Sequence, residues 1–285
     1  MNILVTGGSG FLGSHLVDEL IKKNHKVTIL DKHLPTIKLS KKSRFIKSDL
    51  LSKNLNQAVK NQDIIFHYAG ISGIAESMLN PKLTADYNII GTIRLLELCL
   101  KFNVKRFIFA STVYVNSEDG SFYKSSKRAA EDFIQEYNKK YDLEFTILRF
   151  GTIYGLRANK ENSINNIINT ALRKKRVIYA GRKKNIREYI NVKDAAKIAL
   201  KAMSKKYRNR YIKVSGRNKV PVSKALKIIK KEFGFSSRIL YKNKKDVGHY
   251  TVSPNNFKIK KDIKINFRQT IPFNIGIREI IKSKL

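Results

Sequence analysis

The sequence predicts an α/β fold in which helices cover both faces of a parallel sheet. Short apolar runs alternate with amphipathic segments through the first 150 residues, and the connections between them are short. The apolar runs lack a regular polar alternation, as expected for parallel strands that are covered on both faces. The strand–helix order and the doubly covered strands together favour a doubly wound parallel sheet.

Six strands are expected in the first half of the chain. They cover residues 2–6, 26–30, 44–48, 63–69, 106–111 and 145–150. Helices are expected between them, at residues 11–23, 54–61, 82–102 and 124–140. Helix 82–102 is apolar on more than one face, which indicates burial on two sides and is compatible with contact to a partner subunit.

After residue 150 the alternation becomes less regular. Helices are expected at 162–175, 191–203 and 221–233, strands at 188–192 and 210–216, and a loop-rich stretch at 241–262. No repeat or low-complexity linker separates the two halves. We therefore expect a sheet domain over residues 1–150 and a small α/β lobe over residues 151–285, interleaved into one structural unit.

Composition favours a cytoplasmic protein. The chain has 285 residues, of which 42% are hydrophobic, enough for a sizeable core. It has no run of about 18 apolar residues that would predict a membrane span, and its N-terminus lacks the features of a signal peptide. The lone cysteine, Cys99, cannot form an internal disulfide, which fits a reducing compartment.

The formal net charge of +36 is unevenly distributed. Residues 1–150 contain 22 Lys and Arg against 15 Asp and Glu, a net charge of +7, whereas residues 151–285 contain 36 against 7, a net charge of +29. Such a field attracts phosphates, nucleic acid or an anionic membrane surface. However, the lysines are scattered, no nucleic-acid-binding motif is present, and abundant Lys, Asn and Ile also fit an AT-rich genome. Nucleic acid is therefore not the expected partner.

A glycine-rich turn follows the first strand in "ILVTGGSGFLGSHLVDEL". Gly7 permits the tight turn, Gly10 lets the backbone approach a pyrophosphate, and Gly13 allows close packing of the helix on the sheet. Asp31 closes the second strand, where a carboxylate would accept hydrogen bonds from the adenosine ribose. This arrangement predicts a Rossmann-type site that prefers NAD to NADP, and the neighbouring Lys32 weakens the preference slightly.

A second pattern is Tyr123 followed four residues later by Lys127 in "FYKSSKRAAEDF". On a helix the two side chains share one face, and an ammonium near a phenol favours the phenolate. The pair could therefore act as a base near neutral pH. By itself, the same spacing also fits an ordinary surface helix of a Lys-rich chain.

The glycine turn and the Tyr123–Lys127 pair resemble motifs of the extended short-chain dehydrogenase/reductase family. Five further segments share this resemblance: "SDL" at 48–50, "FHYAGIS" at 66–72, "NIIGTIRLLE" at 88–97, "LRFGTIYGLR" at 148–157 and "NIREYINVKDAA" at 185–196. That family contains the NAD-dependent sugar-nucleotide epimerases and dehydratases. The resemblance implies cofactor contacts from Gly7, Gly10, Phe11, Leu12, Gly13, Asp31, Asp49, Leu50, Tyr68, Ala69, Gly70, Tyr123 and Lys127. It implies substrate contacts from Glu76, Ser77, Thr152 and Arg187, with Arg187 as the diphosphate clamp, and no metal.

The resemblance also implies a catalytic trio. Tyr123 would be the acid/base for a sugar hydroxyl, Lys127 would lower the pKa of Tyr123 and bind the nicotinamide ribose, and Thr112 would hold the reacting oxygen. Ser111, one residue earlier, is the alternative to Thr112. Related dehydratases place an acidic pair directly after the catalytic threonine, where this chain has Val113 and Tyr114.

Lack of extra acids fits a 4-epimerase acting on a nucleotide-diphosphate sugar, with a keto-sugar reductase, dehydrogenase or dehydratase as the alternative. A non-catalytic NAD protein or a polyanion-binding protein is a remoter alternative. The resemblance further implies a homodimer through helices 82–102 and 124–140, and products destined for polysaccharide synthesis. The chain departs from the family pattern at several points, and it is also short for an epimerase of this type. Tyr123 follows Thr112 by only 11 residues, and Tyr87 stands where a smaller residue usually touches the cofactor. Thr152 replaces an asparagine that commonly contacts the nucleotide, and Leu156 replaces the usual proline.

Overall fold

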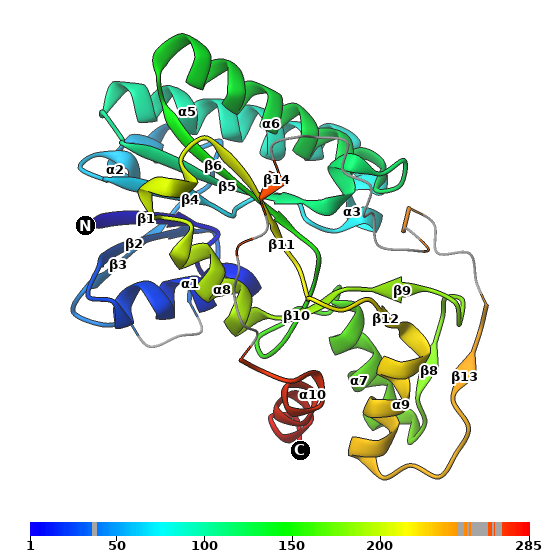
Figure 1. The fold of residues 1–285 in the computed structure, drawn as a ribbon. Coiled ribbons are helices and arrows are strands. Elements are labelled where there is room, and N and C mark those ends of the chain that lie inside the picture. Colours follow the sequence, from blue (N-terminus) through cyan, green and yellow to red (C-terminus); the bar gives the residue numbers. More distant parts are fainter. Residues whose placement is uncertain (36–38, 244–247, 250, 252–261, 264, 266–269) are drawn as a thin grey trace.

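The computed structural model describes residues 1–35, 39–243, 248–249, 251, 262–263, 265 and 270–285. Within them, eight strands form one parallel sheet in the order β14-β11-β6-β5-β4-β1-β2-β3 (Figure 1). These strands are β1 (Asn2–Thr6), β2 (Lys26–Asp31), β3 (Ser43–Lys47), β4 (Ile64–His67), β5 (Arg106–Thr112), β6 (Glu144–Phe150), β11 (Arg210–Val214) and β14 (Asp262–Ile263). The doubly wound α/β fold expected from the sequence is confirmed.

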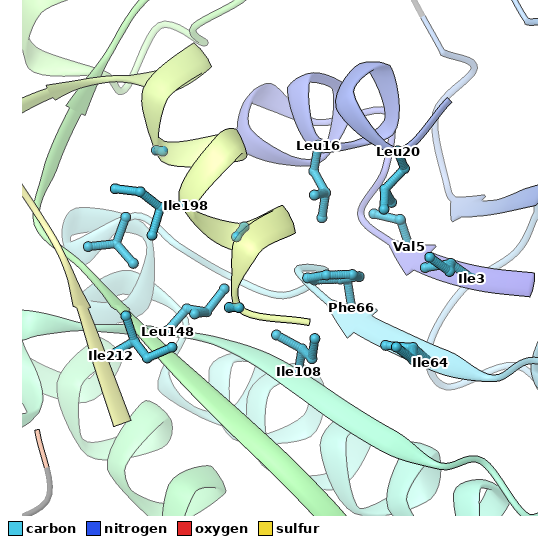
Figure 2. Close-up of a cluster of buried hydrophobic side chains, with 14 of the residues drawn as sticks. Ile3, Val5, Leu16, Leu20, Ile64, Phe66, Ile108, Leu148, Ile198 and Ile212 are labelled. Carbon is cyan, nitrogen blue, oxygen red and sulfur yellow. The ribbon is translucent and has the colours of Figure 1, made fainter. Parts of the chain in front are cut away.

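Helices cover the sheet on both faces. One face carries α1 (Phe11–Lys22) and α8 (Val192–Lys201), and the other carries α2 (Asn56–Val59), α5 (Gly91–Lys101) and α6 (Ser121–Tyr141) (Figure 1). Figure 2 shows the first interface, where side chains of the sheet pack against α1 and α8.

The burial of β1 explains why its sequence lacks polar alternation. Ile3 and Val5 belong to the apolar cluster that includes α1 and α8 (Figure 2). Leu4 belongs to the cluster on the other face, which includes α5. All three side chains are fully buried. A strand that is apolar at every position is therefore what two covered faces require.

The expected helix 82–102 is interrupted. It consists of α4 (Pro81–Ala85), a π-helical turn η2 (Asp86–Ile90) and α5. Such single π turns are frequent at functional sites because the extra residue changes which side chains face inward. Here Asn88 is buried in the turn.

The remaining elements lie in the connections between the strands of the large sheet and in the second lobe. They are η1 (Lys53–Leu55), α3 (Ile74–Leu79), η3 (Val113–Asn116), β7 (Thr152–Tyr154), α7 (Ser163–Lys174), β8 (Ile178–Tyr179), β9 (Ile186–Arg187), β10 (Tyr189–Asn191), η4 (Lys205–Tyr207), β12 (Val220–Pro221), α9 (Val222–Phe233), β13 (Leu240–Tyr241) and α10 (Phe273–Lys282).

The second half of the chain contributes to two parts of the structure. Helices α7, α9 and α10 build a separate apolar core with Tyr154 and Tyr189, and three two-stranded ladders, β7/β10, β9/β12 and β8/β13, accompany it. In contrast, α8, β11 and β14 return to the large sheet. A substrate-binding role for residues 151–285 stays a prediction. The expected loop-rich stretch 241–262 lies largely outside the described residues.

Within the described ranges, no helix is both long and apolar enough to cross a bilayer.

Candidate active site

The glycine turn connects β1 to α1 at the carboxyl edge of the sheet. Gly7 has a φ of +69°, and a Cβ atom there would lie 2.6 Å from the backbone nitrogen of Ala69. A Cβ on Gly13 would lie 2.1 Å from the carbonyl oxygen of Gly7. Neither position can accept a side chain without moving the backbone. Gly10 caps α1, and Phe11 and Leu12 form its partly exposed first turn.

Asp31 fastens the end of β2 to this turn. One carboxylate oxygen accepts the backbone N–H of Ser9 at 3.0 Å, and the other accepts the N–H of His33 at 3.0 Å. The carboxylate therefore lies beside the glycine turn, where the ribose of a dinucleotide is bound in folds of this type.

A buried polar chain supports the segment after β4. The hydroxyl oxygen of Thr6 accepts the backbone N–H groups of Tyr68 and Ala69, each at 3.2 Å, and lies 2.8 Å from Nδ1 of His67. On its other side, Nε2 of His67 lies 3.0 Å from the hydroxyl of Thr92. Burial lowers the pKa of His67 well below its usual value, and the charge of Lys127 lowers it further, so this imidazole is neutral.

The next residues of the same segment are held by the π turn. Asn88 Oδ1 accepts the backbone N–H of Ile71 at 2.8 Å, and its Nδ2 donates to the carbonyl of Ile71 at 2.9 Å and to the hydroxyl of Ser126 at 2.9 Å. Gly70 has a φ of +140°, and a Cβ there would lie 2.5 Å from Asn88 Oδ1. Asn88 thus connects the segment after β4 to α6.

Thr112, Tyr123 and Lys127 come together from β5 and α6. Thr112 ends β5, and its side chain is hydrogen-bonded to Tyr123 in the first turn of α6. Lys127 follows one helical turn later, is 4% exposed, and its Nζ lies 4.6 Å from the ring centroid of Phe109. The three side chains expected to carry the chemistry are therefore neighbours.

The titration of this pair differs from the sequence-based expectation. Burial raises the pKa of Tyr123 to about 12, and the hydrogen bond with Thr112 only partly opposes the rise. Burial lowers the pKa of Lys127 to about 8, and the charge of Glu131 opposes that shift. In the protein alone, Tyr123 is consequently a neutral phenol at pH 7. Burial disfavours the charged forms of both groups more strongly than their proximity stabilises a phenolate next to an ammonium.

Ser111, the alternative to Thr112, belongs to a different cluster. Its hydroxyl donates to Glu131 at 2.5 Å, and Glu131 forms a buried ion pair with Arg149, whose Nε lies 3.0 Å from Oε1. Glu131 lies one turn beyond Lys127 on the same face of α6. The sequence could have indicated it, because Tyr123, Lys127 and Glu131 are spaced four residues apart.

The expected substrate residues are distributed over three elements. Ser77 on α3 is fully buried, donates to the carbonyl of Ile74 at 2.7 Å and accepts the backbone N–H of Tyr123 at 3.1 Å. Its hydroxyl thus fixes the first turn of α6. Glu76 is partly exposed, and burial together with the charge of Glu161 raises its pKa.

The other two expected substrate residues lie in the second lobe. Thr152 begins β7 and is partly exposed. Arg187 on β9 is 8% exposed, and its guanidinium donates to the carbonyl oxygens of Ile186 at 3.0 Å and Thr251 at 3.3 Å. The diphosphate role of Arg187 stays a prediction.

Comparison with known proteins identifies the family. Residues 3–214 match the model of the NAD dependent epimerase/dehydratase family. The chain belongs to this family. The match covers the glycine turn, the segment after β4, the Tyr123–Lys127 pair and β11, so it includes most of the elements that form the large sheet.

Individual members of this epimerase/dehydratase family are similar over almost the whole chain. A Bacillus subtilis protein named as an uncharacterized UDP-glucose epimerase is 29% identical over 271 residues, which cover 86% of each chain. The structure of UDP-glucose 4-epimerase from Thermotoga maritima with UDP-glucose superposes with a TM-score of 0.87 at 27% identity, covering 100% of this chain and 98% of that one. A UDP-N-acetylglucosamine 4-epimerase from Methanobrevibacter ruminantium, in complex with UDP-N-acetylmuramic acid, gives a TM-score of 0.87 at 25% identity, covering 100% and 99%.

The geometry of the site suits the NAD of this epimerase/dehydratase family. The glycine turn leaves backbone N–H groups at the start of α1 free of side-chain obstruction, as a pyrophosphate requires. Among the described residues, the hydroxyls of Ser9 and Tyr68 are buried without a hydrogen-bond partner. Both flank the carboxyl ends of β1 and β4, where a bound dinucleotide would lie.

Proposed function

We propose that the chain catalyses NAD-dependent 4-epimerisation of a nucleotide-diphosphate sugar through a transient 4-keto sugar. The observation that carries the proposal is the contact between Thr112 and Tyr123, with Lys127 one turn away and Val113 and Tyr114 in place of a second acid/base pair. A 4-epimerase needs one proton-transferring group and no more. UDP-hexoses are the first candidates, because UDP sugars are the ligands of the similar structures.

Three side chains of the site have separate roles in the proposed reaction. Tyr123 accepts the proton of the sugar 4-hydroxyl and later returns it, so that no net proton is consumed over the cycle. Thr112 holds the reacting oxygen against the phenol. Lys127, protonated below about pH 8, places a positive charge near Tyr123 and favours the phenolate. NAD, when bound, supplies the reversible oxidation at C4, and its positive nicotinamide ring adds to this charge.

The buried groups below the site keep these side chains in place. Ser77 holds the backbone of Tyr123, and Asn88 connects α6 to the segment that would lie along the cofactor. This pre-arrangement matters because a displacement of about 1 Å can remove much of the rate acceleration.

Proton NMR of the purified protein with NAD and separate UDP-, dTDP-, GDP- and CDP-hexoses tests the proposal. An H4 or anomeric signal that converts to the signal of the 4-epimer, without net NADH, is the expected result and identifies the base. Accumulating NADH, or a new keto or deoxy signal, would instead assign a dehydrogenase or dehydratase. No conversion across the panel would count against epimerisation and favour a keto-sugar reductase or a non-catalytic role.

A homodimer is also part of the proposal. The outward faces of α4, η2 and α6 carry large exposed apolar side chains, among them Leu83 (44% exposed), Ile90 (47%) and Phe133 (42%). Helices α5 and α6 lie side by side on one face of the molecule (Figure 1). We expect light scattering to give a dimer and Phe133→Glu to shift it toward monomer. A cytoplasmic location, supported by the free buried thiol of Cys99, is proposed with it.

A further inference from the structure

Three side chains form a compact cluster next to the expected adenosine end of the cofactor site. Nζ of Lys32 lies 2.7 Å from Oδ2 of Asp49 and 3.9 Å from the ring centroid of Tyr87, and it also contacts the hydroxyl of Tyr87. The Tyr87 hydroxyl donates to the same Oδ2 at 2.5 Å. The other oxygen, Oδ1, accepts the backbone N–H of Leu51 at 2.8 Å. Every polar atom of the cluster is therefore engaged within it or with backbone.

The cluster lies at the edge where the ribose is expected. Lys32 directly follows Asp31 at the end of β2, and Asp49 lies just beyond β3, the neighbouring strand. In dinucleotide-binding folds, a carboxylate at the end of the second strand binds the ribose 2′-hydroxyl of NAD, whereas a nearby cation accommodates the 2′-phosphate of NADP. This chain has both kinds of group side by side. Whether the ribose end of the site favours NAD or NADP therefore depends on whether Lys32 is available to bind a phosphate.

We propose that the ion pair between Lys32 and Asp49, supported by Tyr87, withholds Lys32 from the 2′-phosphate of NADP and thereby sets the preference for NAD. With the pair intact, Asp31 and Asp49 contribute two negative charges against the one positive charge of Lys32. If Asp49 became neutral, Lys32 would balance Asp31 and its flexible side chain could turn toward a phosphate. Asp49 then determines specificity by occupying a cation that would otherwise bind the wrong cofactor.

The protonation states agree with this role. Burial acts to lower the pKa of Lys32, but its bonds to Asp49 and Tyr87 outweigh burial and raise it. Burial likewise acts to raise the pKa of Asp49, but the N–H of Leu51 and the contact with Lys32 outweigh it and lower the value. Both groups are charged at neutral pH. Since Lys32 is 46% exposed, the pair is screened by solvent, and its effect should be a moderate one.

The test is a comparison of the dissociation constants of NAD and NADP, measured by calorimetry on the full chain freed of copurified nucleotide and without sugar. Because both cofactors contain the same adenine, any adenine contact by Asp49 cancels in the ratio. Asp49→Asn should lower the ratio of the NADP dissociation constant to the NAD dissociation constant about tenfold, which corresponds to one charge-assisted contact. Tyr87→Phe, which keeps the ring but removes the hydroxyl, should lower the same ratio about threefold.

Two controls separate the proposed effect from a general change of charge. Lys32→Ala should cancel the effect of Asp49→Asn when the two are combined, because the cation that accepts the phosphate is gone. Asp63→Asn removes a carboxylate from an ion pair of the same length, 2.7 Å to Lys105, at the amino-terminal edge of β4, and should leave the ratio unchanged.

An unchanged ratio in both Asp49→Asn and Tyr87→Phe would overturn the proposal, as would a loss of NADP binding in Lys32→Ala alone. The inference rests on the NAD cofactor of the family and not on epimerisation. Since binding is measured without sugar, its failure would leave the proposed reaction untouched.

Discussion

Asn88 pairs with both backbone polar groups of Ile71, accepting its N–H at 2.8 Å and donating to its carbonyl at 2.9 Å. The same amide donates to Ser126 on α6, directly beside Lys127. One buried side chain therefore determines where the segment after β4 lies relative to the helix that carries Tyr123 and Lys127. The π turn matters because it directs this amide into the protein.

We expect Asn88→Ala to lower the free energy of unfolding by about 3 kcal/mol, since two buried backbone groups lose their partner together with one hydroxyl contact. NAD affinity should fall with it, because the segment of residues 68–71 is released. Urea denaturation and NAD titration measure the two effects. The exposed Asn54→Ala is the control and should change neither quantity. Wild-type stability in Asn88→Ala would show that the hydrogen bonds of Asn88 to Ile71 and Ser126 contribute nothing to the free energy of unfolding.

Tyr123→Phe should lower kcat by a factor of about 10² to 10⁴, because phenylalanine cannot exchange a proton with the sugar hydroxyl. NAD binding should remain nearly unchanged, since the ring and the packing are kept. The measurement is initial rates with the sugar identified by NMR, together with an NAD titration. Tyr141→Phe, at the exposed far end of α6, serves as the matched control. Full turnover in Tyr123→Phe would exclude the phenolate mechanism.

The buried pair of Glu131 and Arg149 gives a prediction about coupling. Glu131→Gln should lower the free energy of unfolding by about 3–5 kcal/mol, because the guanidinium of Arg149, itself 3% exposed, would stay buried without its counter-charge. The double variant with Arg149→Met should cost much less than the sum of the two single variants. Urea denaturation of all four proteins completes the cycle.

An exposed pair provides the comparison for that cycle. Glu136 and Lys139 on the same helix are 2.6 Å apart, with both side chains about two-thirds exposed. Glu136→Gln should leave the free energy of unfolding almost unchanged, because water screens such pairs. Additive effects of Glu131→Gln and Arg149→Met would contradict the prediction that the buried charges depend on each other.

His67 predicts acid sensitivity. Its pKa is lowered in the folded protein, so below about pH 6.5 the unfolded chain binds a proton that the folded chain does not. The free energy of unfolding should therefore fall as the pH falls, by up to about 1.4 kcal/mol per pH unit. His67→Gln should be less stable at pH 7.5 but should lose less stability between pH 6.5 and 5.5. Equal slopes in the two proteins would remove His67 as the cause.

His15 must be considered in the same experiment. It is buried as well, and burial lowers its pKa, so it contributes in the same direction as His67. The difference in slope between the wild type and His67→Gln isolates the contribution of His67.

The fold was predictable from the sequence because its rules act locally. Apolar runs such as "NILVT" read as covered strands, and the positions of Gly7 and Gly13 admit only glycine, so the turn is visible without a structure. The spacing of Tyr123 and Lys127 likewise follows from the period of a helix. Helix 82–102 was predicted as continuous, because a π turn has no distinctive apolar period.

The site required the tertiary structure wherever its contacts join distant parts of the chain. Thr112 rather than Ser111 contacts Tyr123, and Ser77 lies beneath it, because β5, α3 and α6 meet in space. The sequence placed a base near neutral pH at Tyr123, but burial raises the phenol pKa to about 12, and burial is a property of the assembled fold.

Chain order and local patterns thus determined by themselves the parallel sheet and the dinucleotide turn, and the helical period placed Tyr123 and Lys127 on one face of a helix. Only the folded chain decided that Lys32 pairs with Asp49 under Tyr87, that Asn88 clamps Ile71, and that Ser77 is buried. The physical reason is that hydrogen bonds, ion pairs and desolvation depend on distances between residues far apart in sequence, which no local pattern specifies.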